Sequence, residues 1–343
     1  MASGPYRLVL VACDVLAAEV DTVAKSKSAR RSVRLRSHGQ LTPVDRGDAL
    51  VTVSVGPHNE AIAMWSTASG RRALQARTTR PGWASFPEPT TDAGVPVHVA
   101  TYAPQVTSAV RIADLTLAHC HVQPLPEGRI LVVGSRCRWR PEGADRNAII
   151  VDADGTVTRR STLGDGIEHV LATASGKIWA GYFDEGVYGN FGWGGPGPAP
   201  VGATGIVRFT ENLHPEWYFP TDDLDPIDDC YALNVAGETA WSSYYSGFPV
   251  VHIEDTVRSW PGSGSAANAL ITDGTRCALV GGYREHHGRM LVGDLDQGHF
   301  KPYRLTLPGD RPLADRARIV GRGADLHVFI DSAWYRLNLA DLP

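Results

Sequence analysis

The sequence predicts an all-β chain that folds as a single β-propeller with six blades of four antiparallel strands. Three observations favour this fold: 36 glycines and 23 prolines spread over 343 residues, no long segment with helical apolar periodicity, and a hairpin phrase that recurs along the chain. Frequent glycine and proline divide a chain into short elements, and without a 3.6-residue apolar period these elements are expected to be strands. One all-β domain can reach this length.

The recurring phrase consists of an apolar strand, a turn centred on glycine and a second apolar strand. An early weak copy and five clear copies begin at Asp48, His121, His169, Cys230, Ala266 and Arg316. Their turn glycines are Gly56, Gly128, Gly176, Gly237, Gly274 and Gly323, at intervals of 72, 48, 61, 37 and 49 residues. A four-stranded blade takes about 40 to 50 residues. The two long intervals therefore indicate inserted loops in the first and third blades.

Further hairpins supply the outer strands of the blades. They follow several copies, at residues 148–160, 205–219, 250–260 and 290–305, and are typical of antiparallel sheets. A strand-like segment, residues 6–13, precedes the first copy, and WYRLNLADLP ends the chain. We expect these terminal strands to share one blade, because a ring closed by both chain ends has no open sheet edge.

One propeller domain is predicted for residues 1–343. Within it, residues 25–40 are rich in Lys and Arg and are expected to form a basic loop or arm. Residues 184–204 contain Gly, Pro and Trp and are expected to form an inserted loop over the ligand face.

The composition argues against several classes of protein. The net charge is −4 and the basic residues are scattered among acids, so we expect no nucleic-acid partner. Five cysteines without a CxxC pair indicate reduced thiols rather than a disulfide framework or a thiolate zinc site. No apolar run is long enough to span a membrane and no signal peptide is recognised, so we expect no membrane association and a cytoplasmic location.

The segment GDGIEHVLATASGKIWAGYFDEGVYG, residues 164–189, resembles the propeller repeats of the NHL and two-component-regulator kinds. In these repeats a turn glycine and an aromatic residue on the second strand recur. The chain also has a distant similarity to the six-bladed gluconolactonase and strictosidine-synthase groups. That resemblance implies a ligand site at the mouth of the central channel. Ala266 and Cys120 depart from the gluconolactonase pattern, because they stand where oxygen ligands are expected.

The start of each innermost strand should lie at this mouth. Eight residues before the turn glycines stand Asp48, Cys120, Glu168, Asp229, Ala266 and Asp315, and seven residues before them stand His121 and His169 in two blades. Carboxylates gathered around one axis repel one another unless a cation binds, a proton is shared, or neighbouring Arg and His residues, here Arg316 and the two histidines, compensate. We therefore expect Glu168, Asp229 and Asp315 to be candidate ligands of a divalent cation such as calcium. The alternative is that these acids cap turns and pair locally.

The loops after the second strands should open on the same face. They are rich in aromatic and charged residues, which suit a sugar, a ring-containing molecule or a peptide. The candidate ligand-binding residues are Arg138, Trp139, Tyr182, Asp184, Tyr188, Trp193, Tyr244, Tyr245, Tyr283 and His286. The alternative for each single aromatic residue is that it shields a blade edge.

Three functions stay open from the sequence. The first is binding of a polar ring-containing small molecule, a glycan or a short peptide on the loop face. The second is a hydrolase, lyase or cyclase on that face, with His121, His169 and Glu185 as the acid and base candidates. The third is a platform for a protein partner. The sequence names neither a substrate nor an oligomeric state.

Overall fold

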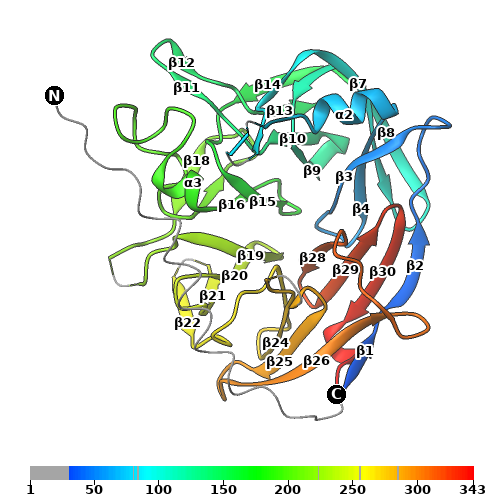
Figure 1. Cartoon of the computed structure of the whole chain (residues 1–343), viewed down its shortest axis with the longest axis vertical. Helices are drawn as coiled ribbons and strands as arrows, with labels where there is room; N and C mark the ends of the chain where they lie inside the picture. Colours follow the sequence, from blue (N-terminus) through cyan, green and yellow to red (C-terminus); the bar gives the residue numbers. More distant parts are fainter. Residues whose placement is uncertain (1–30, 80, 83–84, 223, 255, 284–285) are drawn as a thin grey trace. The chain divides into compact units, whose positions relative to one another are not determined.

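Six antiparallel sheets surround a common centre in the computed structural model, which describes residues 31–343 except 80, 83–84, 223, 255 and 284–285 (Figure 1). Each sheet has four main strands, and the first strand of each lies innermost. The predicted six-bladed propeller is confirmed.

We name the blades A to F in chain order, with the strands of each given from the axis outward. Blade A has β3 (Ala49–Val55), β4 (Ala61–Ser66), β7 (Thr90–Tyr102) and β8 (Val106–Leu117). Blade B has β9 (Cys120–Pro124), β10 (Ile130–Gly134), β13 (Ala148–Val151) and β14 (Val157–Ser161). Blade C has β15 (Ile167–Ala172), β16 (Ile178–Tyr182), β17 (Ile206–Phe209) and β18 (Pro215–Tyr218).

Blade D has β19 (Asp229–Ala236), β20 (Thr239–Tyr245), β21 (Val250–Ile253) and β22 (Val257–Trp260). Blade E has β23 (Ala269–Thr272), β24 (Arg276–Val280), β25 (Arg289–Asp294) and β26 (His299–Leu307), and β26 also pairs with β27 (Arg311–Pro312). Blade F has β28 (Arg318–Arg322), β29 (Asp325–Ile330), β30 (Ala333–Asn338) and β2 (Arg36–Gln40).

Insertions decorate blades A, B and C. Blade A carries α2 (Ala68–Leu74) and the hairpin of β5 (Arg77–Thr78) and β6 (Phe86–Pro87), and blade B carries the hairpin of β11 (Trp139–Arg140) and β12 (Gly143–Ala144). In blade C, the segment 184–204 begins with the one-turn helix α3 (Asp184–Tyr188). Short 3₁₀ turns lie at η2 (Pro126–Gly128) and η4 (Leu339–Asp341). No helix in the described part of the chain has the length and apolar character needed to cross a membrane.

Burial decreases from the second strand of a blade to its edge. Every residue of β4, β10 and β16 is buried, whereas the outer strand β14 has only exposed and half-buried residues. A strand covered by blades on both faces needs apolar residues on both faces, as Ile130–Gly134 shows. An edge strand needs them on neither face, and β14 accordingly carries Arg159 and Arg160.

The N-terminal part of the described chain connects blades E and F. β1 (Ser32–Arg34) pairs in parallel with β26, and β2 then pairs antiparallel with β30. The prediction that strands from both ends of the chain close the ring is confirmed, with Arg36–Gln40 as the closing strand. Residues 6–13, expected in this role, lie outside the described residues. The expectation of a loop over residues 25–40 is wrong for residues 32–34 and 36–40, which are strands, and residues 25–30 lie outside the described chain.

Two buried amides join the innermost strands near their hairpin ends. The Gln123 amide donates to Ser54 Oγ at 2.7 Å and accepts from Ala172 N at 2.9 Å, which links blades A, B and C. The Asn234 amide donates to the carbonyls of Leu270 and Gly323, both at 2.8 Å, which links blades D, E and F. A buried amide needs such partners to offset its loss of hydration.

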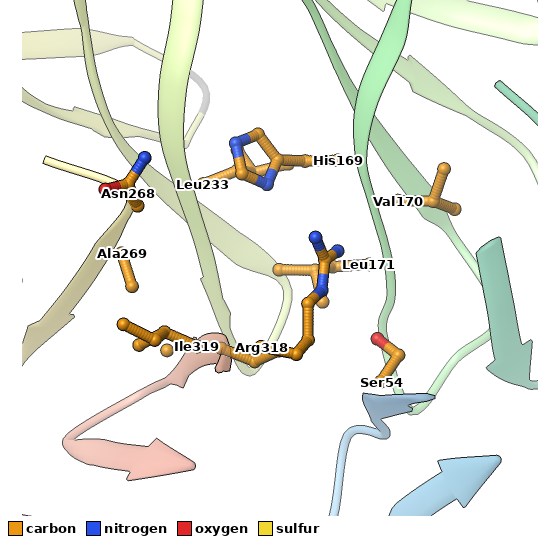
Figure 2. A pocket seen from close by; sticks show the side chains of 11 residues that line it. Ser54, His169, Val170, Leu171, Leu233, Asn268, Ala269, Arg318 and Ile319 are labelled. Carbon is orange, nitrogen blue, oxygen red and sulfur yellow. The ribbon is translucent and has the colours of Figure 1, made fainter. Parts of the chain in front are cut away.

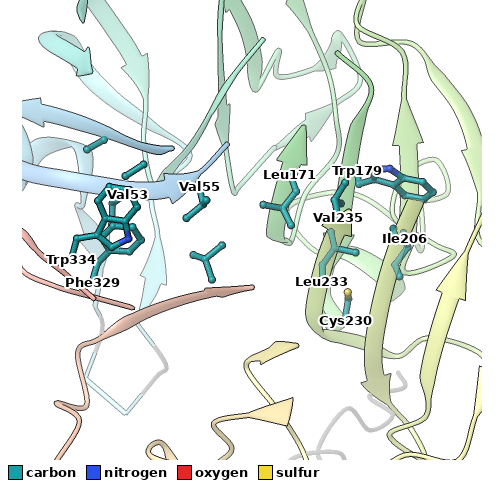
Figure 3. Packing of buried hydrophobic residues seen from close by; sticks show 14 of the residues in the cluster. Val53, Val55, Leu171, Trp179, Ile206, Cys230, Leu233, Val235, Phe329 and Trp334 are labelled. Carbon is teal, nitrogen blue, oxygen red and sulfur yellow. The ribbon is translucent and has the colours of Figure 1, made fainter. Parts of the chain in front are cut away.

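Apolar side chains pack between the blades and toward the centre. Figure 3 shows Leu171, Leu233 and Val235 of blades C and D across from Val55 of blade A. Phe329 and Trp334 of blade F stack at 5.7 Å between ring centroids and join the same cluster. Each large side chain buried in this way contributes roughly 1.5 to 3 kcal/mol.

Candidate functional site

A small pocket lies among the innermost strands. It is lined by residues of β3, β15, β19, β23 and β28 and by Asn268, which directly precedes β23. Figure 2 shows His169, Leu171, Asn268 and Arg318 around it. Its cavity volume is about 20 Å³, which is of the order needed to hold one water molecule. The pocket itself is therefore too small for an organic ligand, and the surface around it is the relevant part of the mouth.

The two predicted catalytic histidines both lie beside this pocket. His121 Nε2 is 3.3 Å from the Ile167 carbonyl oxygen, and His169 Nε2 is 3.1 Å from that of Tyr231. A carbonyl only accepts, so each Nε2 carries the proton in these bonds. Burial, followed by the charge of Arg318, lowers the pKa of His121 to about 3, and burial is also the main cause of the lowered pKa of His169. Both rings are therefore neutral at pH 7.

Arg318 places a positive charge at the mouth, and the sequence reasoning did not find it. Its charge acts on both His121 and His169, and Figure 2 shows its guanidinium near the His169 ring. Within the described part of the chain it is half-buried, with no hydrogen bond or ion pair to a carboxylate. The signal available in the sequence was its place five residues before Gly323, inside the last innermost strand.

Four carboxylates gather at the mouth between blades C and D: Glu168, Asp184, Asp228 and Asp229. Burial is the largest cause that raises the pKa of Asp229 to about 7, and the negative charges of Asp184, Glu168 and Asp228 add to it. None of the four forms an ion pair with Lys or Arg within the described residues. These four residues, named here the acidic group, carry negative charge that the described chain does not neutralise.

Four aromatic residues lie beside the acidic group: Tyr231, Tyr245, Phe248 and Tyr283. The Phe248 ring is 5.7 Å from that of Tyr231 and 5.6 Å from that of Tyr245, and the Tyr283 ring is 5.7 Å from that of Tyr231. Burial and the hydrogen bond to Tyr283 raise the pKa of Tyr231, and the charges of Asp229 and Asp184 contribute. These four residues, named here the aromatic group, therefore adjoin the acidic group.

Tyr188 lies on the acidic side of this surface. It is exposed, and its hydroxyl donates to Asp228 Oδ1. This bond is the main cause that raises the pKa of Tyr188 to about 12. Together with Asp184, Tyr245 and Tyr283, it belongs to the predicted ligand-binding residues that the structure brings together. Tyr231, Phe248 and Asp228 were not among the predicted residues, although Tyr231 stands only two positions after Asp229 at the start of β19.

Three predicted ligand-binding aromatics are buried in the fold instead. Tyr182 and Tyr244 are fully enclosed, and their hydroxyls donate to the carbonyls of Leu163 and Asp225. Trp193 is also buried, and its Nε1 donates to the Cys137 carbonyl at 2.8 Å. A buried Tyr or Trp needs a partner for its polar atom, and each of these uses it within the fold.

Glu185 belongs to a buried charge network. The Arg136 guanidinium makes two bonds of 2.9 Å to Asp165 and lies 2.5 Å from Glu185 Oε2. Burial raises the pKa of Asp165 even though Arg136 opposes that shift. Glu185 is thus held in a cation–carboxylate pair, and its catalytic role stays a prediction.

Arg138 and Trp139 lie beside the inserted segment of blade C. The guanidinium of Arg138 is 5.0 Å from the centroid of the Phe191 ring, and Trp139 N donates to the Phe191 carbonyl at 2.9 Å. Their side chains are half-buried. Within the described chain, neither residue forms a hydrogen bond or ion pair with the acidic group. His286 follows Tyr283 in a turn in which His286 N donates to the Tyr283 carbonyl at 3.0 Å, and the adjacent Arg284 and Glu285 lie outside the described residues.

Of the three predicted cation ligands, the structure brings Glu168 and Asp229 together, and the cation site of Glu168, Asp229 and Asp315 stays a prediction. The charge of Glu168 helps to raise the pKa of Asp229, whereas exposed Asp315 is not among the groups that shift this pKa. Among the described residues, the one group of three His, Cys, Asp or Glu side chains with ligand atoms within 4.8 Å of one another is a different one, Asp45, Asp48 and His98.

The reason lies in the length of the turns. β15 ends four residues before Gly176, whereas β28 ends directly before Gly323. A fixed count back from the glycine therefore reaches Glu168 inside β15 but reaches Asp315 three residues before β28 begins.

Comparisons with known protein sequences assign no family to the whole chain. A sequence model of the YxzG family matches residues 221–261, which contain blade D. No curated protein matches the chain. The matched segment is too short to assign the whole chain to that family.

Solved propeller structures match most of the chain at low identity. A catalytically inactive virginiamycin B lyase from Staphylococcus aureus, with quinupristin, is 10% identical with a TM-score of 0.39, over 89% of this chain and 99% of that one. Apo AztD from Citrobacter koseri is 14% identical with a TM-score of 0.39, over 84% and 83%. The WD40 domain of Neurospora crassa Pan2 is 14% identical with a TM-score of 0.41, over 86% and 81%.

Proposed function

We propose that this protein is a binding propeller whose ligand carries a cationic group, and that a short peptide with an Arg or Lys side chain is the ligand class. The observation that carries the proposal is the acidic group, in which burial and three neighbouring carboxylates raise the pKa of Asp229 to about 7. Like charges held together in a partly buried place are stabilised by a bound cation. A cationic ligand would supply that charge.

The aromatic group supports the same ligand class. A guanidinium or ammonium group gains about 0.5 to 2 kcal/mol over the face of an aromatic ring. Tyr245 and Tyr283 expose 43% and 55% of their surface, so their rings are accessible from solvent. Tyr231 of the aromatic group lies close to the acidic group, because the negative charges of Asp229 and Asp184 help to raise its pKa. Carboxylates beside aromatic faces are suited to a cationic side chain with an apolar stem.

Arg318 supports a peptide over a simple amine. It supplies a second charge, opposite in sign, at the same mouth, where its field reaches His121 and His169. A guanidinium can bind a carboxylate through two parallel hydrogen bonds. A peptide offers both a cationic side chain and a terminal carboxylate.

The test is calorimetric titration with two short peptides, Gly-Arg-Gly and Gly-Gln-Gly, at low ionic strength. We expect saturable binding of the Arg peptide and at least tenfold weaker binding of the Gln peptide, which corresponds to about 1.4 kcal/mol. Binding should strengthen as the pH rises from about 6 to 8, because Asp229 then loses its proton. Equal affinity for the two peptides, or no binding of either, contradicts the proposal.

Variants of the acidic group give the matched control. Glu168→Gln combined with Asp229→Asn removes two charges with little change in shape, and should weaken binding of the Arg peptide at least tenfold. Glu254→Gln removes one exposed charge at the turn between β21 and β22, and should leave the affinity unchanged. If the Glu254 variant loses affinity for the Arg peptide to the same extent, net charge alone explains the effect and the acidic group is not the binding site.

A further inference from the structure

A histidine and two aspartates lie close together where the chain passes from the closing strand of blade F to blade A. Asp45 and Asp48 lie between the closing strand β2 and the innermost strand β3, and Asp48 N donates to the Asp45 carbonyl at 3.2 Å. His98 lies on β7, opposite Trp65 of β4. The ligand atoms of the three side chains all lie within 4.8 Å of one another.

The distances between these side chains are typical of ligands around a metal ion. His98 Nδ1 is 3.6 Å from Asp48 Oδ2 and 3.8 Å from Asp45 Oδ2. Both separations are too long for hydrogen bonds, since a contact of 3.6 Å is no longer one. Nitrogen and oxygen ligands at about 2.1 Å from a tetrahedral metal ion lie roughly 3.4 Å apart. The two distances from His98 are thus within a few tenths of an ångström of those around such an ion, and the two carboxylate oxygens lie within 4.8 Å of each other.

Asp48 gives an independent indication. Its side chain is only 10% exposed, and that of His98 is 17% exposed. Within the described part of the chain, the Asp48 carboxylate accepts no hydrogen bond and its one charged contact is His98. A largely enclosed carboxylate without hydrogen bonds is costly, and Asp48 Oδ2 lies 3.6 Å from the imidazole nitrogen of His98. A divalent cation would offset that cost.

The geometry points to a site for a divalent transition-metal ion such as Zn²⁺, held by His98 Nδ1 and by one oxygen each of Asp45 and Asp48. Imidazole together with carboxylates suits zinc and its neighbours, whereas calcium takes oxygen ligands alone. Asp45 is 68% exposed, so a fourth position is open to water from that side. The ion would fasten the segment between β2 and β3 to β7.

Zinc binding to the whole chain tests this site directly. After dialysis against a chelator, calorimetric titration with zinc sulfate should show one ion per chain, and zinc should raise the melting temperature by a few degrees. Added Co²⁺ should give the visible absorption of a four- or five-coordinate ion. Calcium at the same concentration should leave the melting temperature unchanged. No stoichiometric binding of zinc, or equal stabilisation by calcium, overturns the assignment.

Three variants locate the ion. His98→Gln and Asp48→Asn should weaken zinc binding at least a hundredfold, and His299→Gln, which changes an exposed histidine on β26, should not. Asp45→Asn removes the exposed ligand and keeps the test valid if either buried variant fails to fold. Retention of stoichiometric, tight binding in the Asp45 and Asp48 variants shows that zinc binds elsewhere and overturns the proposal.

Discussion

At the scale of single residues, the mouth of the propeller holds charges that the fold itself does not stabilise. The acidic group has no Lys or Arg partner within the described chain, while Arg136 pairs with both Asp165 and Glu185 nearby. Isolated buried charge lowers stability, and residues kept in that condition are concentrated at functional sites. The contrast between these two neighbouring clusters separates a structural ion network from a candidate binding site.

Asp229→Asn should stabilise the protein in a pH-dependent way. The pKa of Asp229 is about 7 in the fold against an ordinary value of 3.8, so the folded state holds more protons than the unfolded state between these values. Stability therefore falls as the pH rises through that window, and the loss is complete above about pH 7. Asn is neutral throughout. Thermal melts should show the variant a few degrees more stable at pH 8 and equal to the parent near pH 4.

The same variant should bind the Arg peptide more weakly at pH 8, which ties the instability to function. An increase in melting temperature that is the same at pH 4 and pH 8 would contradict the pKa assignment. Glu254→Gln, measured in parallel, shows the effect of removing one exposed charge.

The sequence predicted which residue types gather at the mouth better than which of their side chains face solvent. Tyr182, Tyr244 and Tyr245 all stand near the ends of second strands, yet the first two are buried and the third is exposed. An aromatic residue suits either side of a strand end, because its ring can fill the core while its polar atom bonds to the backbone. Period-two alternation along β20 gives opposite faces to Tyr244 and Tyr245, but it does not say which face is the core.

At the scale of elements, the register of the innermost strands decides which residues reach the axis. The glycine turns could be recognised from the sequence because positive φ favours glycine, as at Gly176 and Gly323. The number of residues between the end of each innermost strand and its glycine could not be recognised. In blade F the fixed count from Gly323 therefore selected Asp315 as the first residue of the strand, although β28 begins at Arg318. Because of this register error, the sequence predicted a negatively charged Asp at the mouth where the structure has a positively charged Arg.

Close contact between innermost strands should make Gly321 intolerant of a side chain. A Cβ atom at Gly321 would lie 1.9 Å from the Leu270 carbonyl oxygen on β23, and backbone cannot move away as a flexible side chain can. Gly321→Ala should therefore lower the free energy of unfolding by about 3 kcal/mol or more, measured by urea denaturation.

Gly288→Ala is the matched control. A Cβ atom there would meet nothing closer than 3.6 Å, so we expect a change below about 0.5 kcal/mol. Equal effects of the two substitutions would show that the approach of β28 to β23 is looser than the distance indicates.

At the scale of the whole molecule, the ring is closed by a segment that the sequence assigned to a loop. In residues 32–40 two apolar positions, Val33 and Leu35, alternate with Arg34 and Arg36, and these charged residues concealed the strand pattern. In the structure these two side chains are 7% and 1% exposed. Edge strands commonly carry charged residues on their solvent side, so a basic composition is compatible with a closing strand.

Leu35 should be the residue on which this closure depends most. It stands between β1 and β2, its N–H donates to the Thr306 carbonyl of blade E at 2.8 Å, and its side chain belongs to a core cluster that includes Leu305 and Leu337 of blades E and F. Leu35→Ala leaves a cavity where the two blades meet. We expect the free energy of unfolding to fall by about 2 to 5 kcal/mol, measured by urea denaturation.

Hydrogen exchange distinguishes a loss of closure from a general loss of stability. If Leu35 joins blades E and F, its replacement should lower the protection of amides in β26 and β30 together. The fully buried strands β10 and β16 of blades B and C should keep their protection. Ser37→Ala changes an exposed residue of the same segment and should alter stability by less than about 0.5 kcal/mol. Uniform loss of protection in all six blades would show that the ring opens as one cooperative unit and that closure at blades E and F is not a separate step.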